Sequence, residues 1–286
     1  MRRACALLVA CGLVVAWLPL RARSDDAAGA VAALVERMTE RVQSYYDRLT
    51  TVAFTESVVQ EDLRPNLTVW GKPHTFEYEV IVTREPPKKG QRLPQIRAER
   101  TLRSEDGKPV GRHHEQQCLD PEESYLDPLM FLLPPTRDLY GFTRRAAADG
   151  PVVLDFAETK MERTQVTWKD SHCFSSDGGR SVGAIWLDPE TADVVRLEKK
   201  LVQPYPILQT SGGSMFSGIV VIEQSELSIR LRQVIFDDPE ETLTLPESIV
   251  TVTAVRNALP RRRRTTQTFT NFHRFMTSGK VRAPGS

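Results

Sequence analysis

Residues 183–198, which read GAIWLDPETADVVRLE, constrain the fold more than any other part of the chain. Two runs rich in branched and aromatic side chains, 183–187 and 194–198, flank a polar turn that begins with Asp188 and Pro189. Branched and aromatic residues favour strands, whereas Asp and Pro favour turns. A turn this short joins antiparallel neighbours, because parallel strands need a crossover of about a dozen residues. The segment therefore predicts a β-hairpin.

The same period of two recurs over most of the chain after residue 51, which predicts further strands. They are expected at 52–58, 76–82, 94–102, 141–147, 152–157, 164–169, 182–187, 194–202, 219–224, 227–236, 247–255 and 265–275. Clusters of turn-forming residues separate many of them, as at 105–108, 149–151, 176–179, 188–191 and 237–239. Short connections of this kind predict an antiparallel meander of about ten strands.

The segment 26–50 has a different period. Its apolar residues recur at spacings of three and four, which predicts one amphipathic helix. One helix before a run of antiparallel strands predicts a mainly β (α+β) fold, a strongly curved sheet whose concave face is closed by the amino-terminal helix. We expect residues 25–286 to form a single domain, in which the sheet spans 51–278.

The amino terminus has the three-part layout of an export signal. Arg2 and Arg3 precede an uncharged run over 4–20, and small residues stand just before Asp25. The sequence therefore predicts a signal peptide over 1–24 and an exported protein of the periplasm or cell envelope. Two alternatives stay open. The apolar run is just long enough to act as an uncleaved anchor, and the residues up to Cys11 fit the lipobox of bacterial lipoproteins.

Charge and cysteine content narrow the functional classes. The 38 basic and 37 acidic side chains nearly balance, and no predicted element has a sustained basic face, which argues against nucleic acid as a partner. Two of the four cysteines lie in the signal peptide. Cys118 and Cys173 remain, and an even pair in an oxidising compartment predicts a disulfide between them.

No set of residues with catalytic spacing stands out. The sequence contains no nucleophile elbow, phosphate-binding glycine loop or dinucleotide fingerprint, so we predict no enzymatic activity and no cofactor. His113 and His114 lie near Cys118, but neighbouring side chains of a strand point to opposite faces, so we predict no metal site. The alternative is a hydrolase that uses Cys118 or Cys173 with a histidine base.

Aromatic side chains are spread over many predicted strands. Directed inward from a half-closed sheet, they would line a cavity large enough for an acyl chain. The expected lining residues are Phe54, Phe76, Tyr78, Phe142, Trp168, Trp186 and Phe272. The alternative is that these side chains fill a dry core.

The basic run Arg261, Arg262, Arg263 and Arg264 follows Leu259 and Pro260, where we expect the tip of a hairpin. At such a tip the run is either a solvated turn or a contact surface for anionic lipid headgroups or an acidic partner.

Several segments resemble the LolA/RseB-like family of periplasmic proteins, which includes the outer-membrane lipoprotein carriers. The segment GAIWLDPETADVVRLE is similar to the strand, Asp-Pro turn and returning strand of that family. The amphipathic helix, the strand VAFTESVVQE with Phe54 and Gln60, and the closing strand TFTNFHRF from Thr268 to Phe275 agree with it. The resemblance implies an unclosed half-barrel sheet capped by helices, with a hydrophobic cavity and a binding role without catalysis.

Two functional hypotheses follow. The first is a secreted, non-enzymatic protein that binds a lipid, an acyl chain or a lipidated protein in its concave apolar face. The second is an RseB-like interaction or sensor module of the cell envelope, whose sheet packs dry and whose loops contact an envelope protein. The sequence does not predict an oligomeric state.

Overall fold

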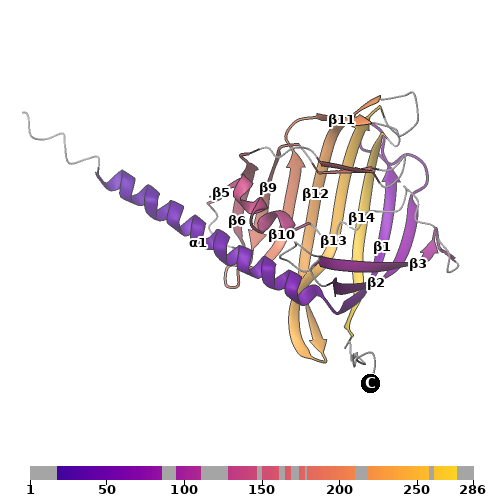
Figure 1. The fold of residues 1–286 in the computed structure, drawn as a ribbon, viewed down its shortest axis with the longest axis horizontal. Coiled ribbons are helices and arrows are strands. Elements are labelled where there is room, and N and C mark those ends of the chain that lie inside the picture. Colours follow the sequence, from indigo (N-terminus) through magenta and orange to yellow (C-terminus); the bar gives the residue numbers. More distant parts are fainter. Residues whose placement is uncertain are drawn as a thin grey trace, which may run out of the picture.

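The computed structural model describes residues 18–85, 95–110, 128–146, 150–160, 165–168, 174–177, 179–209, 218–257 and 261–275. Strands dominate these residues (Figure 1). The elements are α1 (Leu18–Leu49), β1 (Val52–Asp62), β2 (His74–Glu85), β3 (Gln95–Glu105), β4 (Lys108–Pro109), the 3-10 helices η1 (Met130–Leu132) and η2 (Thr136–Leu139), β5 (Tyr140–Arg144), β6 (Val152–Glu158), β7 (Gln165–Trp168), β8 (Phe174–Asp177), β9 (Ser181–Leu187), β10 (Val194–Leu201), β11 (Tyr205–Gln209), β12 (Gly218–Asp237), β13 (Glu240–Arg256) and β14 (Arg262–Arg274).

Twelve strands form one curved antiparallel sheet. Their order is β4-β3-β2-β1-β14-β13-β12-β10-β9-β6-β5, and β11 pairs with β12 beside this path. Most neighbours in the sheet are also neighbours in sequence, as the short turns predict. The exceptions are β10 with β12, β6 with β9 and, at the longest separation, β1 with β14, in which Glu56 lies opposite Phe269. This pairing joins the meander β1–β4 to the meander that ends the chain, and it makes the sheet continuous.

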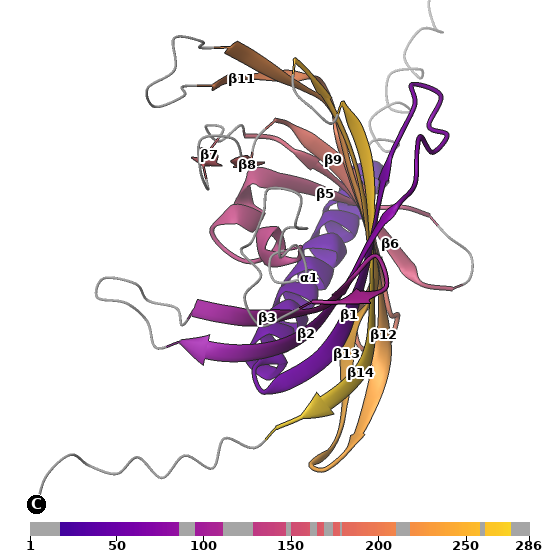
Figure 2. The same ribbon diagram turned by 90° about the vertical axis from the view of Figure 1, so that its right-hand side faces the viewer.

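The fold class expected from the sequence is confirmed. The sheet is antiparallel and strongly bent, and α1 crosses its concave side (Figure 2). The predicted hairpin at 183–198 is the β9–β10 pair, with Ile185 opposite Leu197. The turns expected at 105–108 and 237–239 join β3 to β4 and β12 to β13.

Strand lengths differ from the prediction in two places. The strands expected at 219–224 and 227–236 are one strand, β12, because the polar residues between them continue the pairing with β13. Strand β13 begins at Glu240 rather than near 247, so that β12 and β13 form a long hairpin beyond the rest of the sheet. An exposed polar face does not interrupt a strand whose backbone groups are paired.

Helix α1 presents one apolar stripe to the sheet, as its period predicts. Val35, Met38, Val42, Tyr46 and Leu49 are buried at spacings of three and four. The helix begins at Leu18, inside the predicted signal peptide, and residues 1–17 lie outside the described residues. In the described part of the chain, no helix has the combination of length and apolar character needed to cross a bilayer.

The segment before β5 contains the 3-10 helix η1, which is part of the filling of the concave side. Phe131 and Leu132 of η1 are buried. The Phe131 ring packs 5.1 Å from the ring of Tyr140 and 5.2 Å from that of Phe156. The concave side is therefore occupied both by α1 and by the segment that precedes β5.

Candidate functional site

The aromatic residues predicted to line a cavity mostly meet on the concave side. Phe54, Phe76 and Tyr78 belong to the buried core, and Phe142 and Phe272 pack against it. The rings of Phe54 and Phe272 are 5.5 Å apart. Their meeting follows from register, because Phe54, Phe76 and Tyr78 fall on one face of the β1–β2 pair. Phe76 also packs on Tyr78, and Phe54 and Tyr78 line part of the small hollow described below.

The placement of Trp186 in the cavity is wrong. Trp186 lies opposite Arg196 on the β9–β10 pair, and its ring is 4.7 Å from the Arg196 guanidinium. The core face of this pair is carried by Ile185 and Leu197, so Trp186 points to the convex face. The period of two shows which residues share a face, but it does not show which face is covered.

Trp168, another residue expected to line the cavity, does not belong to the main sheet. It ends β7, which pairs with β8 in a separate two-stranded sheet where Trp168 lies opposite Phe174.

A buried polar network crosses the concave face of β1, β3 and β14. Glu56 is fully buried. Its Oε2 accepts a hydrogen bond from Arg100 Nε at 3.0 Å and lies 2.9 Å from Nη2 of the same arginine. Gln267 Nε2 donates to the other carboxylate oxygen at 2.7 Å. The Arg100 guanidinium stacks 3.8 Å from the centre of the Tyr78 ring. A buried carboxylate requires such partners, because an unpaired one would lose its hydration without compensation.

Sequence reasoning missed this network, although a period of two puts Glu56 on the same face as Phe54 and Val58. A carboxylate inside an otherwise apolar period-two pattern is the signal that points to a buried pair. Its partners were not identifiable, because Arg100 and Gln267 are 44 and 211 residues away in sequence.

The turn between β9 and β10 accepts hydrogen bonds from α1. Asp188 Oδ1 accepts hydrogen bonds from the backbone N–H of Thr191 at 2.8 Å and of Glu190 at 3.0 Å. These bonds hold the pKa of Asp188 below its usual value, the bond from Thr191 contributing most. The turn then offers two carbonyl oxygens to the helix: Arg37 donates to Glu190 O at 2.9 Å and Arg41 to Thr191 O at 2.8 Å. The segment that defines the hairpin thus also positions α1.

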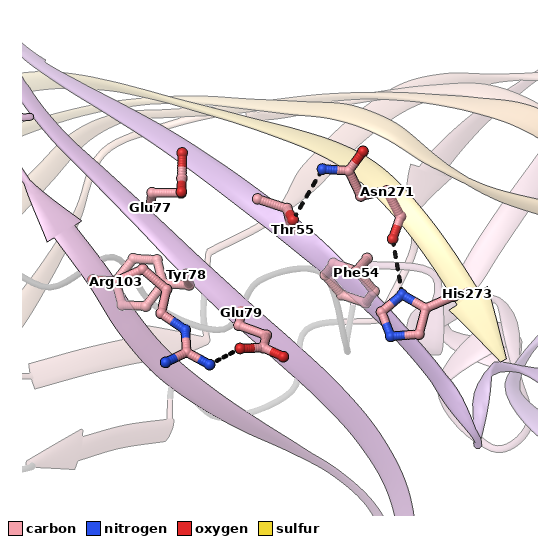
Figure 3. Close-up of a pocket in the computed structure, with 8 residues that line it drawn as sticks. All are labelled: Phe54, Thr55, Glu77, Tyr78, Glu79, Arg103, Asn271 and His273. Atoms are coloured by element: carbon pink, nitrogen blue, oxygen red, sulfur yellow. Dashed lines mark hydrogen bonds and ion pairs between the residues drawn. The ribbon is translucent and has the colours of Figure 1, made fainter. Parts of the chain in front are cut away.

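Two hollows are lined by described residues. The first has a volume of about 170 Å³ and lies over β1, β2, β3 and β14 (Figure 3). Its lining residues are Phe54, Thr55, Glu77, Tyr78, Glu79, Arg103, Asn271 and His273. Asn271 Nδ2 donates to Thr55 Oγ1 at 3.3 Å, and Arg103 pairs with Glu79. The rim is polar, and the volume is below the ~300–1,000 Å³ usual for ligand pockets.

The second hollow lies between α1 and the sheet. It measures about 20 Å³ and is lined by Arg41, Val42, Tyr45, Leu129, Asp193, Val194, Leu231 and Thr244. Burial there raises the pKa of the Tyr45 hydroxyl. This hollow has room for about one water molecule, so α1 is packed closely on the concave face.

The expectation that the basic run forms a hairpin tip is wrong for three of its four residues. Arg262 begins β14, and only Arg261 lies in the connection before it. Arg263 forms an ion pair with Asp62 at 3.1 Å, and Arg264 with Glu61 at 3.3 Å. The run extends β14 because its arginines lie beside the acidic end of β1, which the local sequence around 260 does not reveal.

The predicted disulfide lies outside the described residues, as do His113 and His114. Cys118 and Cys173 are not in the described ranges, so their pairing stays a prediction. Within the described ranges, no group of three or more His, Cys, Asp and Glu side chains is arranged to hold a metal ion.

Comparison with known proteins gives one similarity. No family model matches the chain. No curated protein sequence matches it either. The structure is similar to the crystal structure of a LolA superfamily protein from Nitrosomonas europaea, with 8% sequence identity and a TM-score of 0.38 over 85% of this chain and 94% of that one. The fold assignment rests on the strand order and helix placement described above.

Proposed function

We propose that the protein is a non-enzymatic binding protein of the cell envelope, which holds an acyl chain or a lipidated polypeptide against the concave face of its sheet. One observation carries the proposal: the sheet is open, and its concave side presents a broad apolar surface, broken by the Glu56 network, that α1 crosses (Figure 2). The surface includes Phe54, Val80, Leu197, Ile229 and Ile249, from five different strands, all of them buried.

In this proposal α1 is the element that moves when the ligand binds. Its apolar stripe fills the space that an acyl chain would occupy, and the hollow beneath it is too small for a second occupant. An acyl chain would replace the apolar contacts that the sheet makes with the helix. The apolar stripe of α1 would become exposed, so burial of the acyl chain has to offset that cost. The polar contacts of Arg37 and Arg41 with the β9–β10 turn oppose the movement.

The test is the uptake of a fluorescent fatty acid by Arg41→Ala, with Arg48→Ala as the matched control. Arg41 holds α1 through Thr191 O, whereas the side chain of Arg48 lies exposed on the same helix. Arg41→Ala removes this hydrogen bond and a partly exposed ion pair with Asp193 at 3.4 Å. A loss of about 1 kcal/mol would favour the displaced helix, so we expect uptake to increase about fivefold. Arg48→Ala should bind like the natural sequence.

Native mass spectrometry of protein purified from its host envelope provides the second measurement. Added mass of a lipid or acylated peptide, removable by detergent, supports the proposal. A ligand-free mass together with no uptake of the fatty acid by any variant contradicts it.

The close packing of the concave side favours a second candidate, an RseB-like interaction module without lipid cargo. Its aromatic residues are in mutual contact, with the rings of Phe54 and Phe269 5.6 Å apart. A ligand-free mass combined with capture of an envelope protein supports this candidate.

Counting reactive thiols addresses the hydrolase alternative: two free cysteines, Cys118 and Cys173, would restore it, and their oxidation would remove it.

A further inference from the structure

The connection between β1 and β2 exposes three apolar side chains at one end of the sheet. Leu67, Val69 and Trp70, here called the apolar tip, have exposed fractions of 45%, 37% and 63%. Figure 2 shows this connection in purple at the upper end of the sheet, away from the β12–β13 hairpin at the lower end. Single exposed apolar residues are ordinary, but three within four positions of one loop are a typical binding surface.

The turn at the tip accounts for the backbone of Leu67 but not for its side chain. Leu67 N donates to Arg64 O at 2.9 Å, and Leu67 has a φ of 65°, the left-handed conformation that such a hairpin turn requires of one residue. Asn or Gly would fit this conformation at lower cost, so the turn does not explain why an exposed leucine stands there.

The loop is nonetheless held firmly by hydrogen bonds. Trp70 N donates to Asp62 O at 2.7 Å, and Arg64 N donates to Thr68 O at 2.8 Å. Arg262 Nη1 donates to Pro65 O at 2.7 Å. The tip is therefore presented as a preformed surface, so binding would cost little ordering entropy.

Positive charge surrounds the tip. Arg64, Lys72, Arg261 and Arg262, here called the cationic rim, flank it in sequence or across the β1–β14 pair, and none forms an ion pair with a carboxylate of the described residues. Two nearby acids pair with other arginines: Asp62 with Arg263 and Glu61 with Arg264. A third acid, Asp106, lies 3.6 Å from His74 and also attracts Lys72. With these acids counted, cations still outnumber carboxylates around the tip.

We propose that this end of the sheet is a docking surface for a lipid bilayer that contains anionic lipids. Trp70, Leu67 and Val69 would enter the interfacial layer of the bilayer, where aromatic residues partition, and the cationic rim would contact the headgroups. Apolar anchors beside cations match the chemistry of that interface better than they match an acidic protein surface, which offers nothing for an exposed Trp and Leu to enter. The inference does not depend on a ligand in the concave face.

The decisive measurement locates Trp70 itself. The full chain is mixed with vesicles of 70% neutral and 30% anionic phospholipid carrying brominated acyl chains, and its fluorescence is compared with that of Trp70→Phe. The difference spectrum isolates Trp70, whatever the amino-terminal segment does. We expect a blue shift and quenching of the Trp70 signal, both weakened by high salt and absent with neutral vesicles. An unchanged Trp70 signal overturns the proposal, even if the protein sediments with vesicles or binds an acidic protein.

Vesicle sedimentation then tests the individual residues. Trp70→Ser should lower the partition coefficient by about tenfold, as expected for one large apolar side chain. Lys72→Glu and Arg261→Glu should each lower it by about fivefold or more. The matched control is Ile235→Ser, which removes the 75%-exposed Ile235 from the opposite end of the sheet and should leave binding unchanged. Equal losses in the control and in Trp70→Ser would also contradict the proposal.

Leu67→Asn separates function from folding. This variant should bind vesicles more weakly while its stability stays the same or increases, because Asn tolerates the left-handed conformation. A variant that binds like the natural sequence would show that Leu67 is not part of the docking surface. Binding to vesicles does not require a ligand in the concave face. Loss of vesicle binding is therefore distinguishable from loss of fatty-acid uptake.

Discussion

Replacement of Glu56 by Gln tests the buried ion pair on the concave face. Glu56 and the Arg100 side chain are 0% and 6% exposed, and the carboxylate lies 2.9 Å from Nη2. Removing one partner of such a pair leaves a buried guanidinium without its counter-charge, which costs about 3–5 kcal/mol. We therefore expect Glu56→Gln to lower the free energy of unfolding by that amount, a large share of a typical stability of about 5–15 kcal/mol.

The double variant Glu56→Leu with Arg100→Met tests the reasoning more sharply. Both charges are then absent, and replacing a whole buried pair with apolar residues is often neutral. Gln267 loses its acceptor, which costs about 1–3 kcal/mol. The double variant should accordingly be more stable than Arg100→Met alone, so the two substitutions should not be additive.

Urea unfolding followed by circular dichroism measures these differences. Glu79→Gln is the matched control, because Glu79 pairs with Arg103 on the same sheet but is 42% exposed. An exposed pair contributes about 0–1 kcal/mol, so this variant should unfold nearly like the natural sequence. Equal effects of Glu56→Gln and Glu79→Gln, or additive effects in the double variant, would refute the argument.

The remaining predictions concern the hairpin and the helix. In Gly183→Ala the new Cβ would overlap the Glu198 carbonyl oxygen and the Phe156 ring, so we expect a loss of at least about 1–3 kcal/mol in the unfolding free energy. Gly29→Ala in α1 meets no neighbour and should gain up to about 1 kcal/mol; a loss there would show that the helix is not formed at this position. Asp188→Ala should cost about 1 kcal/mol, and Asp188→Asn less, because Asn Oδ1 can accept the same hydrogen bonds. The pKa of Asp188 is lowered in the folded state, so the stability that Asp188 contributes is present above the unfolded pKa of about 3.9 and is lost as the pH falls through the folded pKa. The unfolding free energy measured at decreasing pH should show this loss in the natural sequence but not in Asp188→Ala.

Local pattern explains why much of the fold was predictable. A period of two and a polar turn determine that residues 183–198 form a hairpin, whatever the rest of the chain does. The same holds for the apolar residues of α1, whose spacing of three and four indicates a helix with one buried face. Strand ends were less predictable. Arg262, Arg263 and Arg264 have the local sequence of a turn, but they form a strand because their backbone pairs with β13 and two of them lie beside Glu61 and Asp62 of β1.

The candidate site was less predictable than the fold, for a geometric reason. Alternation assigns Phe54 and Tyr78 to one face of their hairpin, and both are buried in the core. Applied to Trp186, it leaves two choices of face, and the structure selects the convex one. The covered side depends on where α1 lies, and α1 is placed by bonds from Arg37 and Arg41 to a turn about 150 residues away.

By itself the amino-acid sequence determined the kind of each element, the antiparallel pairing of neighbouring strands and the balance of charge, because these depend on residues close together in the chain. Only the tertiary structure decided that β14 pairs with β1, that Glu56 meets Arg100 and Gln267, and that Trp70 stands exposed beside four cationic residues. Each of these depends on contacts between distant segments, which form when burial of the concave face offsets the entropy of closing long loops.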